Sequence, residues 1–196
     1  MSQKNSYTTS DYVRWDKMMS LTNALYNDGD YKFAMLLMMG SCLGLRISDL
    51  RQLTWQQLLS EKSILDLHEK KTKKFRRLKI NEVLHEFAAD CSNKLGNPTP
   101  DSYIMSARLT DKPMSVQYIN RRLKKIKQQY QLNCCENFST HSLRKTFGRH
   151  VVEKAENAEL GLIRLNKIFN HANIATTRTY LGITQDEQME MYENLF

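Results

Sequence analysis

Two arginines stand where a phosphate group could be bound. Arg46 lies in the run GLRISD, directly after an apolar segment, and Arg144 lies three residues after His141 in the run HSLR. A guanidinium fork holds two phosphate oxygens, and a helix N-terminus beside Arg144 would add to the positive potential. Each residue also has an ordinary explanation: Arg46 would pair with Asp49 at i+3, and HSLR would be a capping turn. If Asp49 instead orients Arg46 toward a ligand, the two arginines would neutralise the extra charge of a pentacoordinate phosphate transition state.

Two histidines and a tyrosine supply candidates for proton transfer and nucleophilic attack. His141 would lie one helical turn from Arg144, where an imidazole moves protons near neutral pH. His171 precedes Tyr180 by nine residues. A phenol, with a pKa of about 10, needs cationic neighbours before it attacks phosphate at neutral pH. A lone histidine or tyrosine near a helix end is usually structural, so the order and spacing of the whole set carry the interpretation.

Apolar periodicity predicts the elements that must position these residues. A first helix, capped by Thr9 or Ser10, ends at the run NDG, residues 27–29. The segment 31–43 is apolar on every side, which predicts a central buried helix. Gly44 would break that helix, and residues 46–53 would form a short helix after the break.

The pattern changes to alternation over residues 63–81, which predicts a β-hairpin with a basic tip at residues 70–77. A loop is expected at residues 96–100. Further helices are expected over 81–95, 114–130, a segment after Thr140, 159–169, 176–181 and 185–194.

The helix predicted for residues 114–130 has one apolar stripe and one strongly cationic face. Its basic residues, which we expect to contact DNA phosphates, are Arg121, Arg122, Lys124, Lys125 and Lys127.

Composition favours a nucleic-acid partner over a membrane. The net charge is +8, with 29 Lys and Arg against 21 Asp and Glu. The longest apolar run, 33–45, is too short to span a bilayer and the N-terminus is too polar for a signal peptide, so we expect a cytoplasmic protein. The four cysteines have no metal-ligand spacing, which predicts reduced thiols and no metal site.

The combined motifs resemble the catalytic boxes of the tyrosine recombinase or phage integrase family over roughly residues 10–192. The resemblance implies that Arg46 and Arg144 grip the scissile phosphate and that His141 is the acid/base histidine. It further implies that His171 donates a hydrogen bond to the phosphate and that Tyr180 forms a 3′-phosphotyrosine. Asp49 matches the acidic residue that supports the first arginine.

The family's catalytic lysine lies in a β-hairpin turn, commonly as Lys-Thr-Gly, and protonates the leaving 5′ oxygen. Lys71 before Thr72 is the best match here. Because Lys73 replaces the glycine, the alternatives Lys70, Lys73 and Lys74 remain open, and all three are also expected to contact DNA. A second departure is Asn170 where the family usually has glycine; Asn tolerates positive φ better than most residues.

The resemblance also implies a mainly α fold with a small antiparallel β-hairpin (α+β), the tyrosine recombinase catalytic-domain fold. We expect residues 1–196 to form this single domain without the N-terminal core-binding domain of most relatives, as in the fimbrial phase-variation recombinases or in a fragment. The expected partners are double-stranded DNA, further copies in a tetramer on two DNA sites, and accessory DNA-bending proteins, with no cofactor. The tail 185–196 would dock on its own domain or on a neighbouring subunit.

Two other functions share parts of this pattern. A type IB topoisomerase has the same catalytic set but reseals the same strand as a monomer. A DNA-binding regulator would keep the fold without the chemistry, but it has no use for a correctly spaced phenol. The sequence therefore favours a recombinase that performs integration, excision or inversion.

Overall fold

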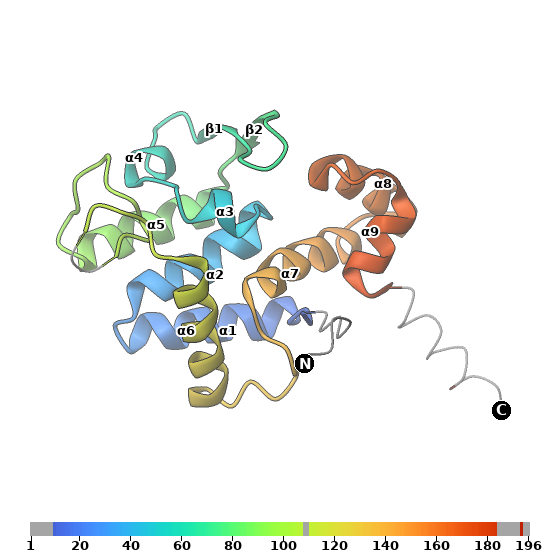
Figure 1. The fold of residues 1–196 in the computed structure, drawn as a ribbon, viewed down its shortest axis with the longest axis horizontal. Coiled ribbons are helices and arrows are strands. Elements are labelled where there is room, and N and C mark those ends of the chain that lie inside the picture. The colour runs from blue at the N-terminus through green and yellow to red at the C-terminus, as the bar shows by residue number, and fades with distance from the viewer. Residues whose placement is uncertain (1–9, 108–109, 184–192, 194–196) are drawn as a thin grey trace, which may run out of the picture.

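The computed structural model describes residues 10–107, 110–183 and 193 (Figure 1). Within these residues the chain is mainly helical with one two-stranded antiparallel sheet, which confirms the predicted α+β class. In chain order the elements are α1 (Trp15–Asn27), α2 (Tyr31–Leu43), α3 (Ile47–Leu50), α4 (Trp55–Leu58), β1 (Ile64–His68), β2 (Phe75–Lys79), α5 (Glu82–Lys94), α6 (Val116–Gln129), α7 (Thr140–Glu153), α8 (Ala158–Phe169) and α9 (Ile174–Leu181).

Helix α2 is the centre of the main core, as its uniformly apolar sequence predicted. It packs against α1, α5 and α7, so its residues are covered on every side. Asp30 caps its first turn, and Gly44 ends it in the left-handed conformation with a φ of 56°. A side chain at Gly44 would collide with the ring of Phe147, so this position needs glycine for space as well as for conformation. The chain turns here and delivers Arg46 to the edge of the core.

The predicted hairpin is present, with β1 and β2 paired antiparallel from Ile64 with Lys79 to His68 with Phe75. Leu65 is buried on the inner face. The connecting turn carries the lysines, and Lys73, at the position of the family glycine, has a φ of 57°. The turn therefore keeps a left-handed residue although glycine is absent.

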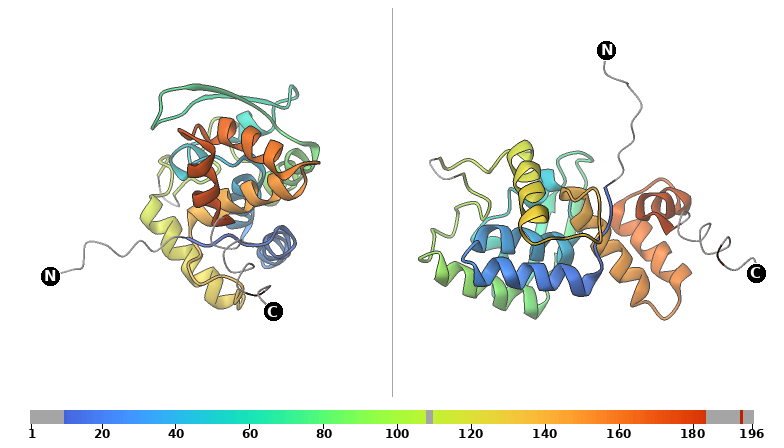
Figure 2. Two further views of the ribbon diagram at one scale, coloured as in Figure 1. Left: turned by 90° about the vertical axis from the view of Figure 1, so that its right-hand side faces the viewer. Right: turned by 90° about the horizontal axis from the view of Figure 1, so that it is seen from below.

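Helices α8 and α9 lie at one end of the molecule, away from α5, and α7 runs from the centre, beside α2, toward them (Figures 1 and 2). A second, smaller apolar cluster of Leu162, Leu165, Phe169 and Leu181 joins these three helices. Asn170 ends α8 with a φ of 53°, the left-handed conformation predicted for it. This turn brings α9, and with it Tyr180, back against α7.

Apart from shifts of one or two residues, the boundaries differ from the sequence prediction at two places, the start of α1 and the end of α3. The predicted cap at Ser10 is wrong: α1 begins at Trp15, and the Ser10 hydroxyl instead lies 2.6 Å from the hydroxyl of Ser139. The helix predicted for 46–53 ends at Leu50, and a separate short helix, α4, follows behind a Thr54 capping box. Thr9, the alternative cap, and the helix predicted for 185–194 fall outside the described residues, apart from residue 193.

In the described part of the chain, no helix combines the length and apolar character needed to cross a membrane. The four cysteines are free thiols.

Candidate active site

The two predicted phosphate-binding arginines lie side by side. Arg46, at the N-cap of α3, and Arg144, in α7, each donate a hydrogen bond from Nη2 to the backbone oxygen of Phe169 at 3.3 Å. Arg144 also donates from Nη1 to the Gly44 oxygen, and its guanidinium carbon lies 3.9 Å from the centre of the Phe169 ring. The break after α2, the first turns of α7 and the end of α8 thus meet at one point.

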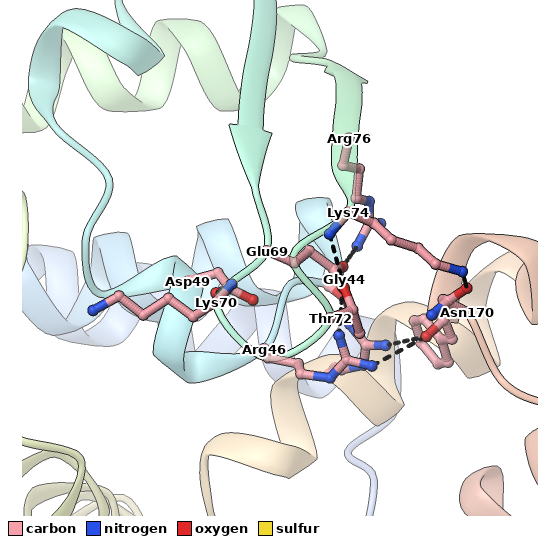
Figure 3. A network of polar contacts seen from close by, with 11 residues as sticks. Gly44, Arg46, Asp49, Glu69, Lys70, Thr72, Lys74, Arg76 and Asn170 are labelled. Atoms are coloured by element: carbon pink, nitrogen blue, oxygen red, sulfur yellow. Dashed lines mark hydrogen bonds and ion pairs between the residues drawn. The ribbon is translucent and has the colours of Figure 1, made fainter.

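The carboxylate that holds Arg46 is Glu69, and not the expected Asp49. Glu69 is 3% exposed and pairs with Arg46 at 2.6 Å and with Arg76 at 3.0 Å (Figure 3). It also accepts a hydrogen bond from the Thr72 hydroxyl at 2.8 Å. Asp49 accepts from the backbone N–H of Lys70 at 2.9 Å instead, so it supports the hairpin turn. Both carboxylates therefore tie the lysine turn to the region of Arg46.

Glu69 and Arg76 are site residues that the sequence analysis missed. The available signal was an acidic residue at the end of a predicted strand, immediately before a run of lysines. A carboxylate there would be expected to lie close to cations, but nothing local identifies Arg46 as its partner.

The site carries an excess of positive charge. Burial lowers the pKa of Arg144 to about 10, and the charges of Arg46 and Arg76 lower it further against the opposing effects of Tyr180 and Glu69. Among these groups, the single carboxylate of Glu69 pairs with Arg46 and Arg76 and leaves Arg144 without a carboxylate partner. A bound anion would relieve the repulsion and restore the charge balance.

Tyr180 lies beside the arginines in an aromatic setting. Its ring centre is 5.6 Å from that of Phe169, 5.4 Å from that of His171 and 6.4 Å from that of His141. Its hydroxyl is buried, and no hydrogen bond of normal geometry reaches it from the described residues. Burial raises the pKa of Tyr180 to about 12, opposed by Arg144 and Arg46. The phenol is thus protonated at rest and needs a proton acceptor to attack.

The two predicted histidines flank Tyr180 from different elements. His141 is exposed in the first turn of α7, which Ser139 and Ser142 cap reciprocally. Partial burial lowers the pKa of His141, and the charges of Arg144, Lys145, Arg46 and Lys71 lower it further.

His171 follows the turn at Asn170 and is partly buried. Burial and the charges of Arg144 and Arg46 lower the pKa of His171. Both imidazoles are therefore neutral at neutral pH and available for hydrogen bonding and proton transfer.

The hairpin lysines occupy different positions around the site. Lys74 donates a hydrogen bond from Nζ to Asn170 Oδ1 at 2.7 Å, whereas the side chain of Lys70 extends away from the Arg46 network (Figure 3). Lys71 is exposed, and its charge is close enough to lower the pKa of His141. Lys73 is exposed at the left-handed turn position. Of the four, Lys71 is the one whose charge affects His141.

Helix α6 has the predicted buried stripe, with Ile119, Leu123 and Ile126 fully buried. Its cationic residues divide into two groups. Arg122 pairs with Asp30 at 2.8 Å, and Lys127 donates to the Glu136 oxygen at 2.9 Å.

The second group, Arg121, Lys124 and Lys125, is exposed. Asn120 of the same helix accepts a hydrogen bond from the backbone N–H of Thr140, so α6 adjoins the start of α7. The exposed cations therefore lie on the helix that abuts the His141 turn.

In the described residues, no group of three or more His, Cys, Asp or Glu side chains is placed to hold a metal ion. The arginines, histidines and tyrosine together place fixed cations and imidazoles around one phenol.

Comparison with known proteins identifies the family and the fold. The sequence model of the phage integrase family matches residues 12–187. The chain is 30% identical to the probable integrase/recombinase YoeC of Bacillus subtilis over 167 residues, which cover 85% of this chain and 84% of YoeC. It is 26% identical to the tyrosine recombinase XerA of Pyrococcus horikoshii over 94% of this chain but only 59% of XerA.

Solved structures share the fold. The crystal structure of XerA recombinase superposes with a TM-score of 0.70 at 19% identity, over 96% of this chain and 66% of that chain. XerH recombinase bound to its palindromic difH substrate superposes with a TM-score of 0.69 at 14% identity, over 99% of this chain and 55% of that chain. The chain thus spans between half and two thirds of these structures. It belongs to the phage integrase family and has the catalytic-domain fold of the tyrosine recombinases.

Proposed function

We propose that this protein is a site-specific DNA recombinase that cleaves and rejoins DNA through a 3′-phosphotyrosine at Tyr180. The observation that carries the proposal is the convergence of Arg46 and Arg144 on one point beside the buried hydroxyl of Tyr180. Fixed guanidiniums next to a phenol provide a phosphate clamp and a nucleophile together.

The reaction assigns each group one task. The Tyr180 oxygen attacks the scissile phosphorus, and its proton passes to His141 as the bond between the phosphorus and the 5′ oxygen breaks. Lys71 gives its proton to the departing 5′ oxygen. Arg46 and Arg144 neutralise the charge on the phosphate, and His171 donates a hydrogen bond to it.

The covalent intermediate explains how rejoining proceeds without an outside energy source. The phosphotyrosine replaces one phosphodiester with another ester of phosphate, so a 5′-hydroxyl can reverse the step without ATP. Attack by the 5′-hydroxyl of a second duplex would give strand exchange, and the arginines would supply the charge that a metal ion provides elsewhere.

The proposed partners are double-stranded DNA and further copies of the chain. Several solved relatives are DNA complexes, among them a transposon integrase with transposon right-end DNA and a lambda integrase dimer on a core site. Strand exchange between two duplexes would require four protomers in a closed ring. The tail 185–196, proposed to link neighbouring protomers, lies outside the described residues except for Glu193. The cytoplasm as the location and accessory DNA-bending proteins as partners remain predictions.

The experiment that tests the proposal traps the intermediate. A nicked suicide substrate should accumulate a covalent protein–DNA adduct, and peptide mapping should place the DNA on Tyr180. Two-site substrates should then give Holliday junctions. Relaxed circles without junctions would indicate a topoisomerase, and specific binding without any adduct would indicate a regulator.

We expect Lys71→Ala to lose cleavage of ordinary DNA and to regain it on a substrate with a 5′-bridging phosphorothiolate. The sulfur leaves without needing a proton, so it bypasses the loss of the general acid. Single-turnover cleavage rates on the two substrates measure the effect. Lys74→Ala, which loses the hydrogen bond to Asn170, is the matched control and should not be rescued. Rescue of Lys70→Ala, Lys73→Ala or Lys74→Ala instead would move the general acid to that lysine.

DNA binding should weaken steeply as salt rises, because phosphate contacts release counterions. Replacing Arg121, Lys124 and Lys125 together with Gln should reduce the slope of log affinity against log salt by about 0.9 for each phosphate that the variant no longer neutralises. Fluorescence anisotropy across a salt series measures that slope. The control replaces three exposed lysines outside α6 and the hairpin, namely Lys17, Lys94 and Lys154. Equal slopes for the two triple variants would remove α6 from the DNA interface.

A further inference from the structure

The buried side of the His171 ring contacts a hydroxyl that neither the motifs nor the proposed chemistry use. Thr177, in α9, is fully buried, and its Oγ1 lies 3.0 Å from His171 Nδ1. The amide nitrogen of Asn166, in α8, donates to the same Oγ1 at 3.1 Å. A chain of three side chains therefore runs from α8 through α9 to the imidazole.

The direction of this chain follows from what each group is able to donate. The Asn166 amide nitrogen is a donor only, so the Thr177 oxygen accepts from it. The Thr177 hydroxyl proton is then directed to the remaining neighbour, His171 Nδ1, which must accept it with a lone pair. An imidazole that accepts at Nδ1 carries its own proton at Nε2.

We propose that Thr177 is a positioning residue that, together with Asn166, fixes His171 as the Nε2–H tautomer. This inference rests on the proposed function, in which His171 donates a hydrogen bond to the scissile phosphate. The Nε2–H tautomer presents an N–H on the side of the ring away from Thr177. The other tautomer would present a lone pair there, which repels a phosphate oxygen.

The tautomer matters because the ring is neutral. Burial and the charges of Arg144 and Arg46 lower the pKa of His171, so a second ring proton is disfavoured near pH 7. The phenol of Tyr180 packs against the ring, and His141 in turn packs against Tyr180. A neutral imidazole has one N–H, and Thr177 decides which nitrogen carries it.

The surrounding fold holds Asn166, Thr177 and His171 in place. The backbone N–H of His171 donates to the Asn166 oxygen at 3.2 Å, and Asn173 caps α9 by accepting from the backbone N–H of Thr176 at 2.8 Å. The buried apolar cluster that contains Leu165, Phe169 and Leu181 packs α8 against α9. Since Thr177 is fully buried, bulk water does not reach its hydroxyl to replace either neighbour.

Nitrogen-15 NMR of the histidine side chains tests the tautomer directly in the full-length, DNA-free protein. The wild-type His171 signals, assigned by their loss in His171→Phe, should show a protonated Nε2 and an unprotonated Nδ1. Asn166→Asp should reverse the direction of these hydrogen bonds. A carboxylate accepts the Thr177 proton, so the hydroxyl is then able only to accept from His171 Nδ1–H. A wild-type Nδ1–H tautomer, or an unchanged Nε2–H tautomer in Asn166→Asp, would overturn the assignment.

Single-turnover cleavage tests the consequence. Thr177→Val, which keeps the shape but removes the hydroxyl, should slow cleavage by about ten- to a hundredfold, the scale of one weakened hydrogen bond to a charged group. Thr177→Ser should restore most of the rate. Thr176→Val is the matched control on the same helix and should cleave at the wild-type rate, since its hydroxyl faces Asn173. Wild-type cleavage by a folded Thr177→Val would overturn the positioning role.

The proposed function and the proposed role of Thr177 can be disproved separately. If wild-type protein forms no adduct at Tyr180, the proposed function is wrong whatever the tautomer of His171. If the adduct forms while NMR finds the Nδ1–H tautomer, the function stands and the role of Thr177 is wrong.

Discussion

Tyr180→Phe should bind its DNA site as tightly as the wild type and form no covalent adduct. The substitution removes the one oxygen that attacks phosphorus and leaves the ring, with its contacts to Phe169 and His171, in place. The fold should not suffer, because the hydroxyl that is removed is buried without a hydrogen bond of normal geometry. Deleting an unsatisfied buried polar atom is neutral or stabilising.

Suicide-substrate trapping measures adduct formation, and a binding assay on the same preparation measures DNA affinity. The matched control is Tyr26→Phe, which loses an exposed hydrogen bond from α1 to Asp90 of α5. This variant should form the adduct normally. Cleavage by Tyr180→Phe would refute Tyr180 as the nucleophile. Failure of Tyr180→Phe to bind would mean that the phenol contributes to DNA recognition.

Arg46→Ala and Arg144→Ala should each reduce the cleavage rate by about a hundred- to a thousandfold, the scale of losing one strong contact to transition-state charge. Ground-state binding should weaken much less, because many other cations contact the backbone. Arg→Lys at either position should recover only part of the rate, since an ammonium lacks the planar fork that holds two oxygens.

The two arginines should differ in their effect on stability. Arg144 is 3% exposed and donates to two backbone oxygens, so its loss leaves buried acceptors unsatisfied and should lower the melting temperature. The side chain of Arg46 is 21% exposed, although its removal leaves Glu69 with one partner fewer. Rates should therefore be compared at a temperature where circular dichroism finds both variants folded.

A matched control is Arg77→Ala in β2, which breaks an exposed pair with Asp66 and a contact with the ring of Phe75 and should cleave normally. Full activity after replacement of both Arg46 and Arg144 would exclude the phosphate clamp.

Local spacing determined most of the helices and the hairpin. An all-apolar run followed by glycine specifies a buried helix that ends there, and α2 has the predicted bounds from Tyr31 to Leu43. Alternation around a basic turn specifies the hairpin, and an Asn at a left-handed turn specifies the end of α8 at Asn170. These features depend on interactions within a few residues, which the sequence displays directly.

The early end of α3 reflects a local capping box at Thr54, whereas the unexpected side-chain partners are distant in the sequence. Ser10 was expected to cap its own helix, but its hydroxyl contacts Ser139, the cap of α7. Arg122, predicted to contact DNA, pairs with Asp30, a partner that the sequence of its own helix does not reveal. A polar side chain that could bond to a local or to a distant partner bonds to the one that the packed fold brings close. Sequence periodicity does not reveal which partner that is.

The same distinction between local features and distant partners applies to the candidate active site. The sequence alone predicted which residues would carry the chemistry, because the order and spacing of Arg46, the HSLR run, His171 and Tyr180 are specific in combination. Only the tertiary structure decided how they are held. The buried Glu69, brought from the hairpin, replaced Asp49 as the partner of Arg46, and Thr177 became the neighbour of His171. Asp49 lies within one turn of Arg46 and is also buried, but its carboxylate accepts from the backbone N–H of Lys70, so the packing of the hairpin and not the i+3 spacing decides which carboxylate meets the guanidinium.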